Sequence, residues 1–358
     1  MSTRLRVAIL GASGYGGLGL IERLNAHPEV LVTALQSRQY ESKTEAECWP
    51  SLARHPLAEM RFRETEEALE LADVFFTATP HGVTAPIVNQ LLAAGKHVVD
   101  LSADYRLDEA TFHTWYGTHP YPAHFTHAVY GLPEFHRAEL PGARLVASPG
   151  CNATAGTLAL APFAANGWLT TQIPSVNIIT GVTGAGRGMK QPFHYPELAE
   201  NTYAYSAAGT HRHIAEIAMT TRRLQTAKTK ELSSHSPVEA FPLTFTPHLV
   251  PMNRGILASA AFPAPHGTTT DEVLELLHEF YADDMQVVVQ AELPQTKAVS
   301  NTDHALITGR YDAYAGTINT YVALDNLGKG ASGQAVQAFN IAFGFAEDTA
   351  LKRAGSWI

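Results

Sequence analysis

The sequence predicts a two-domain α/β protein, in which a parallel-sheet domain is followed by an α+β domain with a largely antiparallel sheet. Its 358 residues are more than one hydrophobic core usually organises. The first 150 residues alternate short apolar runs with helical segments, which is typical of a parallel sheet with helices on both faces. Beyond residue 165 the apolar runs lengthen and this alternation stops, which favours antiparallel pairing.

Five apolar runs of strand length are the predicted strands of the first domain. They are RVAILG (6–11), VLVTALQ (30–36), DVFFTATP (73–80), KHVVDLSAD (96–104) and RLVASPG (144–150). Between them, GLGLIERLNAH (17–27) and VTAPIVNQLLAAG (83–95) are predicted helices, and the second of these ends at a glycine.

The second domain is predicted from longer runs and one amphipathic helix. The strands are SVNIITGVTG (175–184), VEAFPLTFTPHLV (238–250) and RGILASAAFPA (254–264), and the helix is TTDEVLELLHEFYAD (269–283). The polar segment 226–237 is expected to be an exposed loop. A last helix within GQAVQAFNIAFGFA (333–346) is expected to return to the first domain. We therefore predict a nucleotide domain of residues 1–150 joined by 326–358, and a catalytic and oligomerisation domain of residues 151–325.

The composition excludes several classes of function. A net charge of −9 and a pI near 6.0 argue against a nucleic-acid partner, which would need a basic stripe. The sequence has neither a signal peptide nor an apolar stretch of membrane-spanning length. Two cysteines do not make a disulfide framework, so we expect a reducing cytoplasm.

A glycine-rich turn, GASGYGG (11–17), joins the first predicted strand to the first predicted helix. Its glycines allow a tight turn and let backbone N–H groups approach a pyrophosphate at the helix N-terminus, as in a Rossmann-type domain. The spacing is a variant of the usual dinucleotide fingerprint, and a turn without a ligand is the alternative. The predicted cofactor-binding residues of the turn are Gly11, Ser13, Gly14, Tyr15 and Gly16.

The end of the second strand indicates which cofactor binds. An acidic residue there usually holds a free ribose 2′-hydroxyl, whereas this chain has Ser37 and Arg38. A hydroxyl and a guanidinium suit a 2′-phosphate, so NADP is favoured over NAD, although Arg38 could equally be a solvated surface residue. Thr79 and Pro80 follow a later parallel strand, at the edge where the ligand crevice of such sheets lies.

Cys151 follows a predicted strand and a Pro-Gly turn, and it precedes a predicted helix. A thiol at a helix N-terminus lies near the positive end of the dipole, which lowers its pKa and favours the nucleophilic thiolate. The same N–H groups can stabilise an oxyanion. A small buried hydrophobe is the alternative for Cys151, and Cys48 is expected to be inert.

A nucleophilic cysteine needs a proton partner, and GTHRHIAEI (209–217) offers His211, His213 and Glu216. In an extended segment the two histidines would share a face, so either could act as acid–base residue with Glu216 orienting it. A metal site is the alternative, because His119, His124 and His127 cluster in another segment, but zinc-like spacing is missing and we expect no metal.

Arg106 and Arg187 are candidate anchors for a substrate carboxylate or phosphate, because both lie in turn or glycine-containing segments. A structural salt bridge is the alternative for either residue.

Taken together, these motifs resemble the N-acetyl-gamma-glutamyl-phosphate reductase family of arginine biosynthesis over essentially the whole chain. The supporting stretches are GASGYGG, ATPHG, VVDLSADYRL, VYGLPE, GCNAT, GVTGAGR, HRHIAEI, HLVPMNRGIL and DNLGKGASGQAVQ. The resemblance implies NADPH-dependent reduction of an acyl phosphate to an aldehyde through a thioester on Cys151. It also implies that Arg106, Arg187 and Asn152 lie near the substrate. Three residues would reach the nicotinamide pocket, namely Asn326, Gly330 and Gln334.

Two departures leave the substrate open. The common family pattern after the cysteine is Tyr-Pro-Thr, whereas this chain has Asn152-Ala153-Thr154, and Ala215 replaces a proline of the histidine motif. Both resemble the branch that reduces aminoadipyl or glutamyl phosphates attached to an amino-group carrier protein, whereas GVTGAGR and HLVPMNRGIL resemble the enzymes that use a free acetylated substrate. We favour the free substrate; a non-catalytic NADP sensor is a third hypothesis. An antiparallel sheet with one open face would allow a homodimer or homotetramer.

Overall fold

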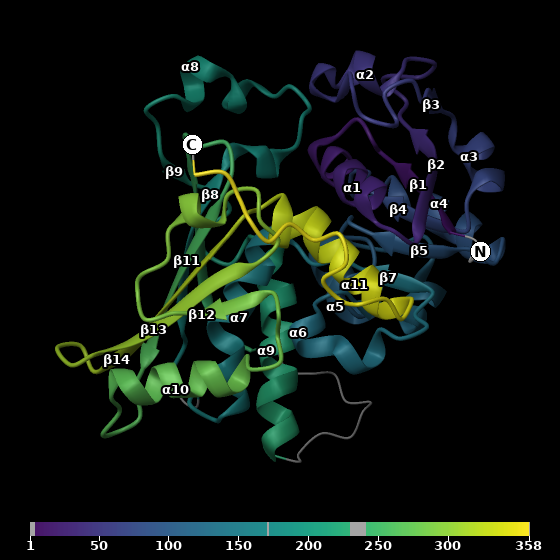
Figure 1. Ribbon diagram of the computed structural model, residues 1–358. Coiled ribbons are helices and arrows are strands. Elements are labelled where there is room, and N and C mark those ends of the chain that lie inside the picture. Colours follow the sequence, from purple (N-terminus) through teal and green to yellow (C-terminus); the bar gives the residue numbers. More distant parts are fainter. Residues whose placement is uncertain (1–3, 170–171, 230–240, 358) are drawn as a thin grey trace. The chain divides into compact units, whose positions relative to one another are not determined.

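The computed structural model describes residues 4–169, 172–229 and 241–357 (Figure 1). The chain forms two compact units, each of which is described separately. The first runs to Pro149 and includes Ala331–Lys352, and the second comprises Gly150–Gly330 and Arg353–Ile358. Residues 326–330 and 353–357, which the prediction of about 326–358 placed with the nucleotide domain, lie in the second unit.

The first unit is built on a seven-stranded sheet in the order β3-β2-β1-β4-β5-β7-β6, and every pairing is parallel. The strands are β1 (Leu5–Leu10), β2 (Val30–Gln36), β3 (Phe62–Arg63), β4 (Val74–Thr77), β5 (His97–Asp100), β6 (Ala128–Tyr130) and β7 (Leu145–Ala147). The helices are α1 (Tyr15–Ala26), α2 (Glu45–Cys48), α3 (Thr65–Leu71), α4 (Thr84–Ala93), α5 (Glu109–Tyr116), α6 (Pro133–His136) and α11 (Gly333–Ala342).

Helices cover both faces of this sheet, as the alternating pattern predicted. Along β1, Val7 and Ile9 enter one apolar cluster together with residues of α1 and α11. Ala8 and Leu10 point the opposite way and join a second cluster with residues of α3 and α4. Because both faces are largely buried, the strands are mainly apolar, and polar residues within them, such as Arg6 and Thr33, lie at exposed or half-buried positions.

The second unit contains another seven-stranded sheet, in the order β12-β13-β14-β11-β8-β10-β9. Four pairings are antiparallel, and those of β8 with β10 and β12 with β13 are parallel. The strands are β8 (Ser175–Gly181), β9 (Tyr203–Ala204), β10 (Thr244–Val250), β11 (Ile256–Pro263), β12 (Val287–Val289), β13 (Ala305–Asp312) and β14 (Thr317–Leu324). The predicted fold class, a parallel-sheet domain plus an α+β domain, is confirmed.

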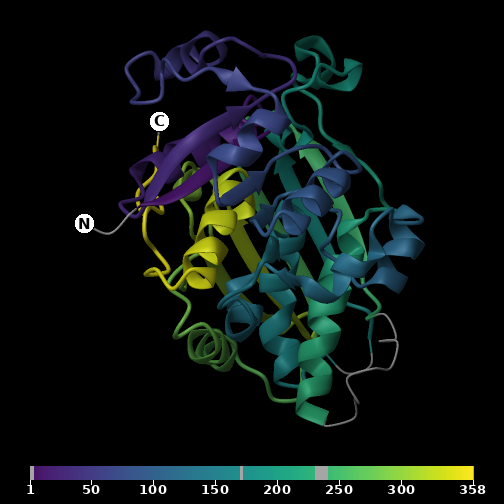
Figure 2. The same cartoon turned by 90° about the vertical axis from the view of Figure 1, so that its right-hand side faces the viewer.

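Helices α7 (Cys151–Ala165) and α10 (Thr270–Phe280) pack on one face of this sheet. Helix α9 (His213–Thr229) lies alongside α7 (Figure 2), and the short α8 (Tyr195–Leu198) follows β8 in the chain. On β8, Asn177 and Ile179 point away from the helices and are exposed. One face of the sheet therefore presents side chains to the surface.

Two predicted elements differ from those observed, and the strands β3, β6, β9, β12, β13 and β14 were not predicted. Strand β10 begins at Thr244, whereas the prediction began at residue 238, and residues 238–240 lie outside the described part of the chain. The segment 226–237 was predicted to be a loop, but α9 continues through residue 229; residues 230–237 are not described. The hairpin of β13 and β14 was not predicted, although it forms one end of the sheet with β12.

Candidate active site

Cys151 is the first residue of α7, and the extended backbone of Gly150 forms the helix N-cap. The first turn of α7 contains no acidic residue, and no side chain caps it. The N-terminal N–H groups and the helix dipole thus create a local preference for negative charge at the thiol. Helix α7 is buried along nearly its whole length, from Asn152 to Ala164, so the cysteine lies on a rigid element.

Helix α9 brings a histidine and a carboxylate to this N-terminus. Glu216 is buried, and its Oε2 accepts a hydrogen bond of 2.9 Å from the backbone N–H of Gly150. Its Oε1 lies 4.0 Å from Nε2 of His213, the first residue of α9. The His213 ring packs so closely on Gly150 that a Cβ at position 150 would overlap it. The structure thus brings Cys151, His213 and Glu216 together, as the sequence suggested.

The two histidines of the motif have different environments. The backbone N–H of His213 donates to Nδ1 of His211 at 3.1 Å. Burial, reinforced by the neighbouring His213, lowers the pKa of His211 to about 3. His211 is therefore neutral at ordinary pH, which favours His213 as the acid–base residue. The prediction that both histidines lie in one extended segment is wrong. His213 is the first residue of α9, whereas His211 lies before the helix.

Asn152 and Tyr205 complete the surroundings of the thiol. The Cys151 thiol donates to Oδ1 of Asn152 at 3.9 Å, and Nδ2 of Asn152 donates to the Tyr205 hydroxyl at 3.2 Å. Burial, together with the electrostatic interaction with Cys151, raises the pKa of Tyr205 to about 12. Tyr205 therefore stays a neutral hydroxyl beside the cysteine. The sequence analysis missed it, and the only local signal was its position six residues before His211.

The glycine-rich turn lies at the carboxyl edge of the first sheet. Gly11 has a φ of +77°, and a Cβ there would lie 2.5 Å from the carbonyl oxygen of Ala78. A Cβ on Gly17 would lie equally close to Cα of Ala12. Helix α1 begins after Gly14 with no acidic residue in its first turn, so its N-terminal N–H groups suit a pyrophosphate.

The remaining predicted cofactor residues of the first unit lie around this edge. The Ser13 and Ser37 hydroxyls are 2.7 Å apart, and the Tyr15 ring lies beside Trp49. The Thr79 hydroxyl is 2.6 Å from that of Thr84, which also donates to the Pro80 carbonyl at 3.5 Å. Gly16 leaves room for a small side chain, because its nearest neighbours would lie 3.7 and 3.8 Å from a Cβ.

A cavity opens at the end of β2. Two arginines contribute to its wall, Arg38 from the predicted motif and Arg63 from β3, which the sequence analysis did not select. The full lining is Gln36, Ser37, Arg38, Glu41, Arg63, Glu64, Thr65 and Glu66. The charge of Glu41 raises the pKa of Glu64. The cavity wall thus carries a hydroxyl, two guanidinium groups and three carboxylates, and Arg63 also pairs with Glu67 at 3.3 Å.

The five other predicted residues are divided between the units. Arg106 donates to the Leu101 carbonyl at 2.8 Å in the first unit, and Arg187 is half-buried in the second unit, so the two arginines do not share one unit. Asn326 accepts from the Gly255 N–H at 2.8 Å and donates to Thr183 at 2.9 Å within the second unit. Gly330 also belongs to the second unit, whereas the buried Gln334 donates to the Gly131 carbonyl at 3.0 Å in the first.

The histidines of residues 119–127 pack within the first unit. His119 is buried among aromatic rings that include Tyr105 and Phe125, and burial lowers its pKa. His124 pairs with the side-chain oxygen of Asn89 at 3.0 Å. Within the described ranges, no three His, Cys, Asp or Glu side chains are grouped so that they could hold a metal ion. None of the helices searched there is long and apolar enough to cross a membrane.

Comparison with known proteins identifies the two halves of the chain. Residues 6–143 match the family model described as semialdehyde dehydrogenase, NAD binding domain. Residues 151–326 match the model described as semialdehyde dehydrogenase, dimerisation domain. Two solved structures of aspartate-semialdehyde dehydrogenases share the fold. The enzyme of Vibrio cholerae is 19% identical with a TM-score of 0.66, and the match covers 95% of this chain and 98% of the other. The enzyme of Candida albicans is 16% identical with a TM-score of 0.68, and the match covers 94% of this chain and 99% of the other.

Several relatives with higher identity carry one name. The N-acetyl-gamma-glutamyl-phosphate reductase of Thermus thermophilus is 45% identical over 98% of this chain and 100% of its own length. Those of Pelobacter propionicus and Symbiobacterium thermophilum are each 41% identical, over 97% and 98% of this chain and 98% of their own lengths. These relatives confirm the predicted enzyme class and the resemblance on which it rested. The chain belongs to the N-acetyl-gamma-glutamyl-phosphate reductase family.

Proposed function

We propose that this protein reduces N-acetyl-gamma-glutamyl phosphate to N-acetylglutamate 5-semialdehyde, with NADPH as reductant and release of phosphate. The names of its relatives supply the substrate. The observation that carries the chemistry is the placement of Cys151 at the start of α7, with His213 and Glu216 packed against the adjoining Gly150.

Cys151 acts as the nucleophile. Its Sγ attacks the acyl carbon, a carbon–sulfur bond forms, and the carbon–oxygen bond to phosphate breaks with its electron pair leaving on phosphate. The N–H groups at the start of α7 stabilise negative charge on sulfur before the attack and on the carbonyl oxygen during it. Arg106 and Arg187 bind the anionic groups of the substrate.

His213 acts as the general acid–base residue. NADPH, when bound, supplies the hydride that reduces the thioester carbonyl. His213 donates a proton to the resulting oxygen and accepts it again as the aldehyde forms, while the carbon–sulfur bond breaks and the Cys151 thiolate returns. Glu216 positions His213 and at the same time holds the backbone of Gly150, so one carboxylate couples the acid–base residue to the nucleophile.

The residues of the first unit fit an NADP molecule. The α1 N-terminus, with no acidic residue in its first turn, suits the pyrophosphate. The cavity lined by Ser37, Arg38 and Arg63 suits the 2′-phosphate, for which NAD has no counterpart. We assign Arg63 to this contact together with the two residues of the predicted motif.

The protein is proposed to form a homo-oligomer, a dimer or a tetramer, in the cytoplasm. The exposed residues of β8, Asn177 and Ile179, mark the sheet face that would pair with a second copy. The second-unit family model also describes a dimerisation domain. Neither Cys48 nor Cys151 is in a disulfide, which suits a reducing compartment.

A side-by-side assay tests the substrate. The purified protein is given NADP, inorganic phosphate and either free N-acetylglutamate semialdehyde or semialdehydes attached to an amino-group carrier protein, and NADPH formation is followed by absorbance. We expect phosphate-dependent turnover of the free substrate. Turnover of the carrier-attached substrate alone would instead support the branch suggested by Asn152 and Ala215, and binding of NADP without any turnover would indicate a sensor.

A further inference from the structure

The turn after β14 packs directly against the nucleophile. A Cβ on Gly330 would lie 2.8 Å from Cβ of Cys151 and 3.2 Å from the carbonyl oxygen of Asp325, so only glycine permits this approach. Gly328 is equally constrained, because a Cβ there would overlap the carbonyl oxygen of Thr302. The turn is therefore fitted between Cys151 on one side and residues 301–302 on the other.

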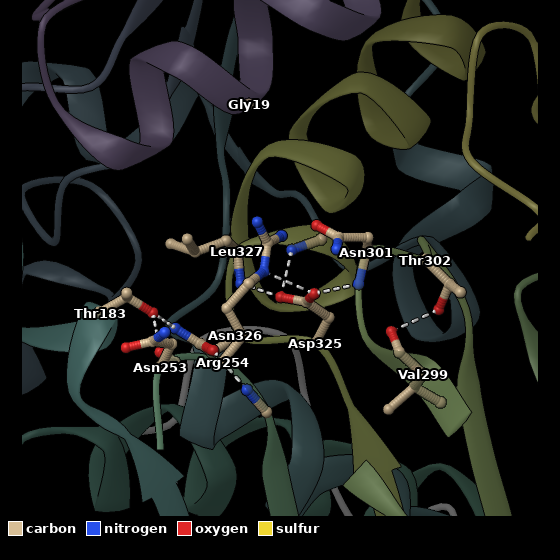
Figure 3. Close-up of polar contacts among 12 residues, drawn as sticks. Gly19, Thr183, Asn253, Arg254, Val299, Asn301, Thr302, Asp325, Asn326 and Leu327 are labelled. Carbon is tan, nitrogen blue, oxygen red and sulfur yellow. Dashed lines mark hydrogen bonds and ion pairs between the residues drawn. The ribbon is translucent and has the colours of Figure 1, made fainter. Parts of the chain in front are cut away.

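One buried carboxylate holds this turn (Figure 3). Oδ1 of Asp325 accepts from the backbone N–H groups of Leu327 at 2.8 Å and Gly328 at 3.2 Å. Its Oδ2 accepts from the backbone N–H of Asn301 at 2.6 Å. The Asp325 carbonyl also accepts from the N–H of Gly330 at 2.9 Å, which closes the turn into the single π-helical turn Gly328–Ser332.

Arg254 balances the charge of this carboxylate. Asp325 is fully buried, and Nε of Arg254 donates to its Oδ2 at 2.8 Å. The next residue, Gly255, donates its N–H to Asn326, and Asn326 donates to Thr183 (Figure 3). Hydrogen bonds thus join three chain segments, residues 183, 254–255 and 301, to Asp325 and Asn326 at the start of the turn. A buried charge that is paired and fully hydrogen-bonded specifies one conformation, whereas an uncharged amide could satisfy only some of these donors.

We propose that Asp325 is a positioning residue for the reaction: by fixing the turn that ends at Gly330, it sets the place of Cys151 at the start of α7. The inference rests on the proposed role of Cys151 as nucleophile. Asp325 touches neither thiol nor substrate in this scheme. Its effect passes through the contact between the backbone of Gly330 and the side-chain Cβ of Cys151. Small displacements of a reacting group are costly because attack requires a narrow range of distance and angle.

The hairpin of β13 and β14 supplies a control. Asp312 is the last residue of β13, and its Oδ1 accepts from the N–H groups of Tyr314 at 2.9 Å and Ala315 at 3.1 Å in the turn that leads to β14. Asp312 and Asp325 thus both hold a turn at an end of β14 by the same kind of hydrogen bond. Only the Asp325 turn reaches Cys151.

The test compares D325N with D312N in the full-length protein. The measurements are kcat, KM for the semialdehyde, and the rate of iodoacetamide alkylation of Cys151 across pH, followed by mass spectrometry of the Cys151 peptide. For D325N we expect kcat to fall by about 100-fold with KM little changed, and the alkylation profile to shift. D312N should retain the wild-type kcat and the wild-type alkylation profile. Wild-type kcat and alkylation in D325N, or equal losses in both variants, would overturn the proposal.

G330A tests the same contact without altering the buried charge, and it replaces D325N if that variant does not fold by circular dichroism. It should change the alkylation profile of Cys151 and lower kcat, and a folded G330A with wild-type values would refute the positioning role. Alkylation needs neither substrate nor cofactor. A wild-type protein inactive on the semialdehyde, with D325N still altered in alkylation, would therefore refute the proposed substrate and leave the positioning role supported.

Discussion

The two units build their sites in different ways. In the first unit the glycine turn and the strand ends offer mainly backbone N–H groups, and the tight constraints are steric, as at Gly11 and Gly17. In the second unit the proposed chemistry depends on the side chains of Cys151, His213 and Glu216 near the starts of two helices. The first site should therefore fail when an atom is added, and the second when a functional group is removed.

Removal of the thiol should give the largest effect. C151S keeps the shape of the side chain but replaces a thiolate by a hydroxyl that is not ionised at neutral pH, so we expect kcat to fall by roughly 1,000-fold or more. NADPH affinity, measured by fluorescence titration, should stay unchanged because the turn of α1 is untouched. C48S is the control, since Cys48 is buried in the core of the first unit, and it should retain kcat. Full activity in C151S would exclude the thioester route.

Addition of one methyl group should break the first unit. In G17A the new Cβ would lie 2.5 Å from Cα of Ala12, so we expect about 3 kcal/mol of lost stability and weaker NADPH binding. G16A is the matched control, because a Cβ there meets only ordinary contacts of 3.7 and 3.8 Å. Thermal unfolding and NADPH titration measure both variants. Equal stability of G17A and G16A would contradict the steric argument.

Substitutions in the cavity at the end of β2 test the part of the first unit in which side chains, and not backbone N–H groups, are proposed to bind NADPH. R38A should weaken NADPH binding by about 1.5–3 kcal/mol, which is about 10- to 100-fold in affinity, because a charge-assisted phosphate contact is lost. R63A should also weaken NADPH binding. Neither R38A nor R63A should alter the binding of NADH. The control is R61A, since Arg61 is exposed and does not line the cavity. An unchanged NADPH-to-NADH preference in R38A would remove the NADP assignment.

The sequence predicted those parts of the site that depend on neighbouring residues in the chain, namely the turn at Cys151 and the glycine-rich turn. The Pro-Gly pair before a helical run indicated the position of Cys151, and the strand–turn–helix pattern indicated the glycine turn of Gly11 and Gly14. Five strands of the parallel sheet were predicted because their runs are mainly apolar, whereas the short strands β3 and β6 were missed. The hairpin of β13 and β14 was missed, although its strands alternate in burial along much of their length.

Long-range contacts account for what the sequence analysis missed. Tyr205 reaches Asn152 across 53 residues, and Arg254 reaches Asp325 across 71. Arg63 faces the cofactor cavity only because the two-residue strand β3 pairs with the end of β2. The choice between His211 and His213 depends on burial and on the residue where α9 begins. A periodic pattern in the sequence does not predict contacts between segments that are so far apart along the chain.

The smallest predicted effect concerns the histidine that does not titrate in the working range. Burial lowers the pKa of His211 to about 3 in the folded state, whereas an unfolded histidine has a pKa of about 6.5. Between these values the unfolded chain binds the additional proton, so this contribution to stability is complete above about pH 6.5 and is lost as the pH falls. The expected loss is about 1 kcal/mol between about pH 7 and 5.5.

Urea unfolding at several pH values tests this assignment with H211N. An asparagine Oδ1 can replace Nδ1 as acceptor for the His213 N–H, so the fold should survive while the acid-side slope of stability decreases. The slope should not vanish, since burial also lowers the pKa of His304 in the same unit. H278N, on the exposed surface of α10, should keep the wild-type slope. An unchanged slope in H211N would mean that His211 binds its proton equally well in the folded and the unfolded chain, and the choice of His213 as acid–base residue would then lose its support.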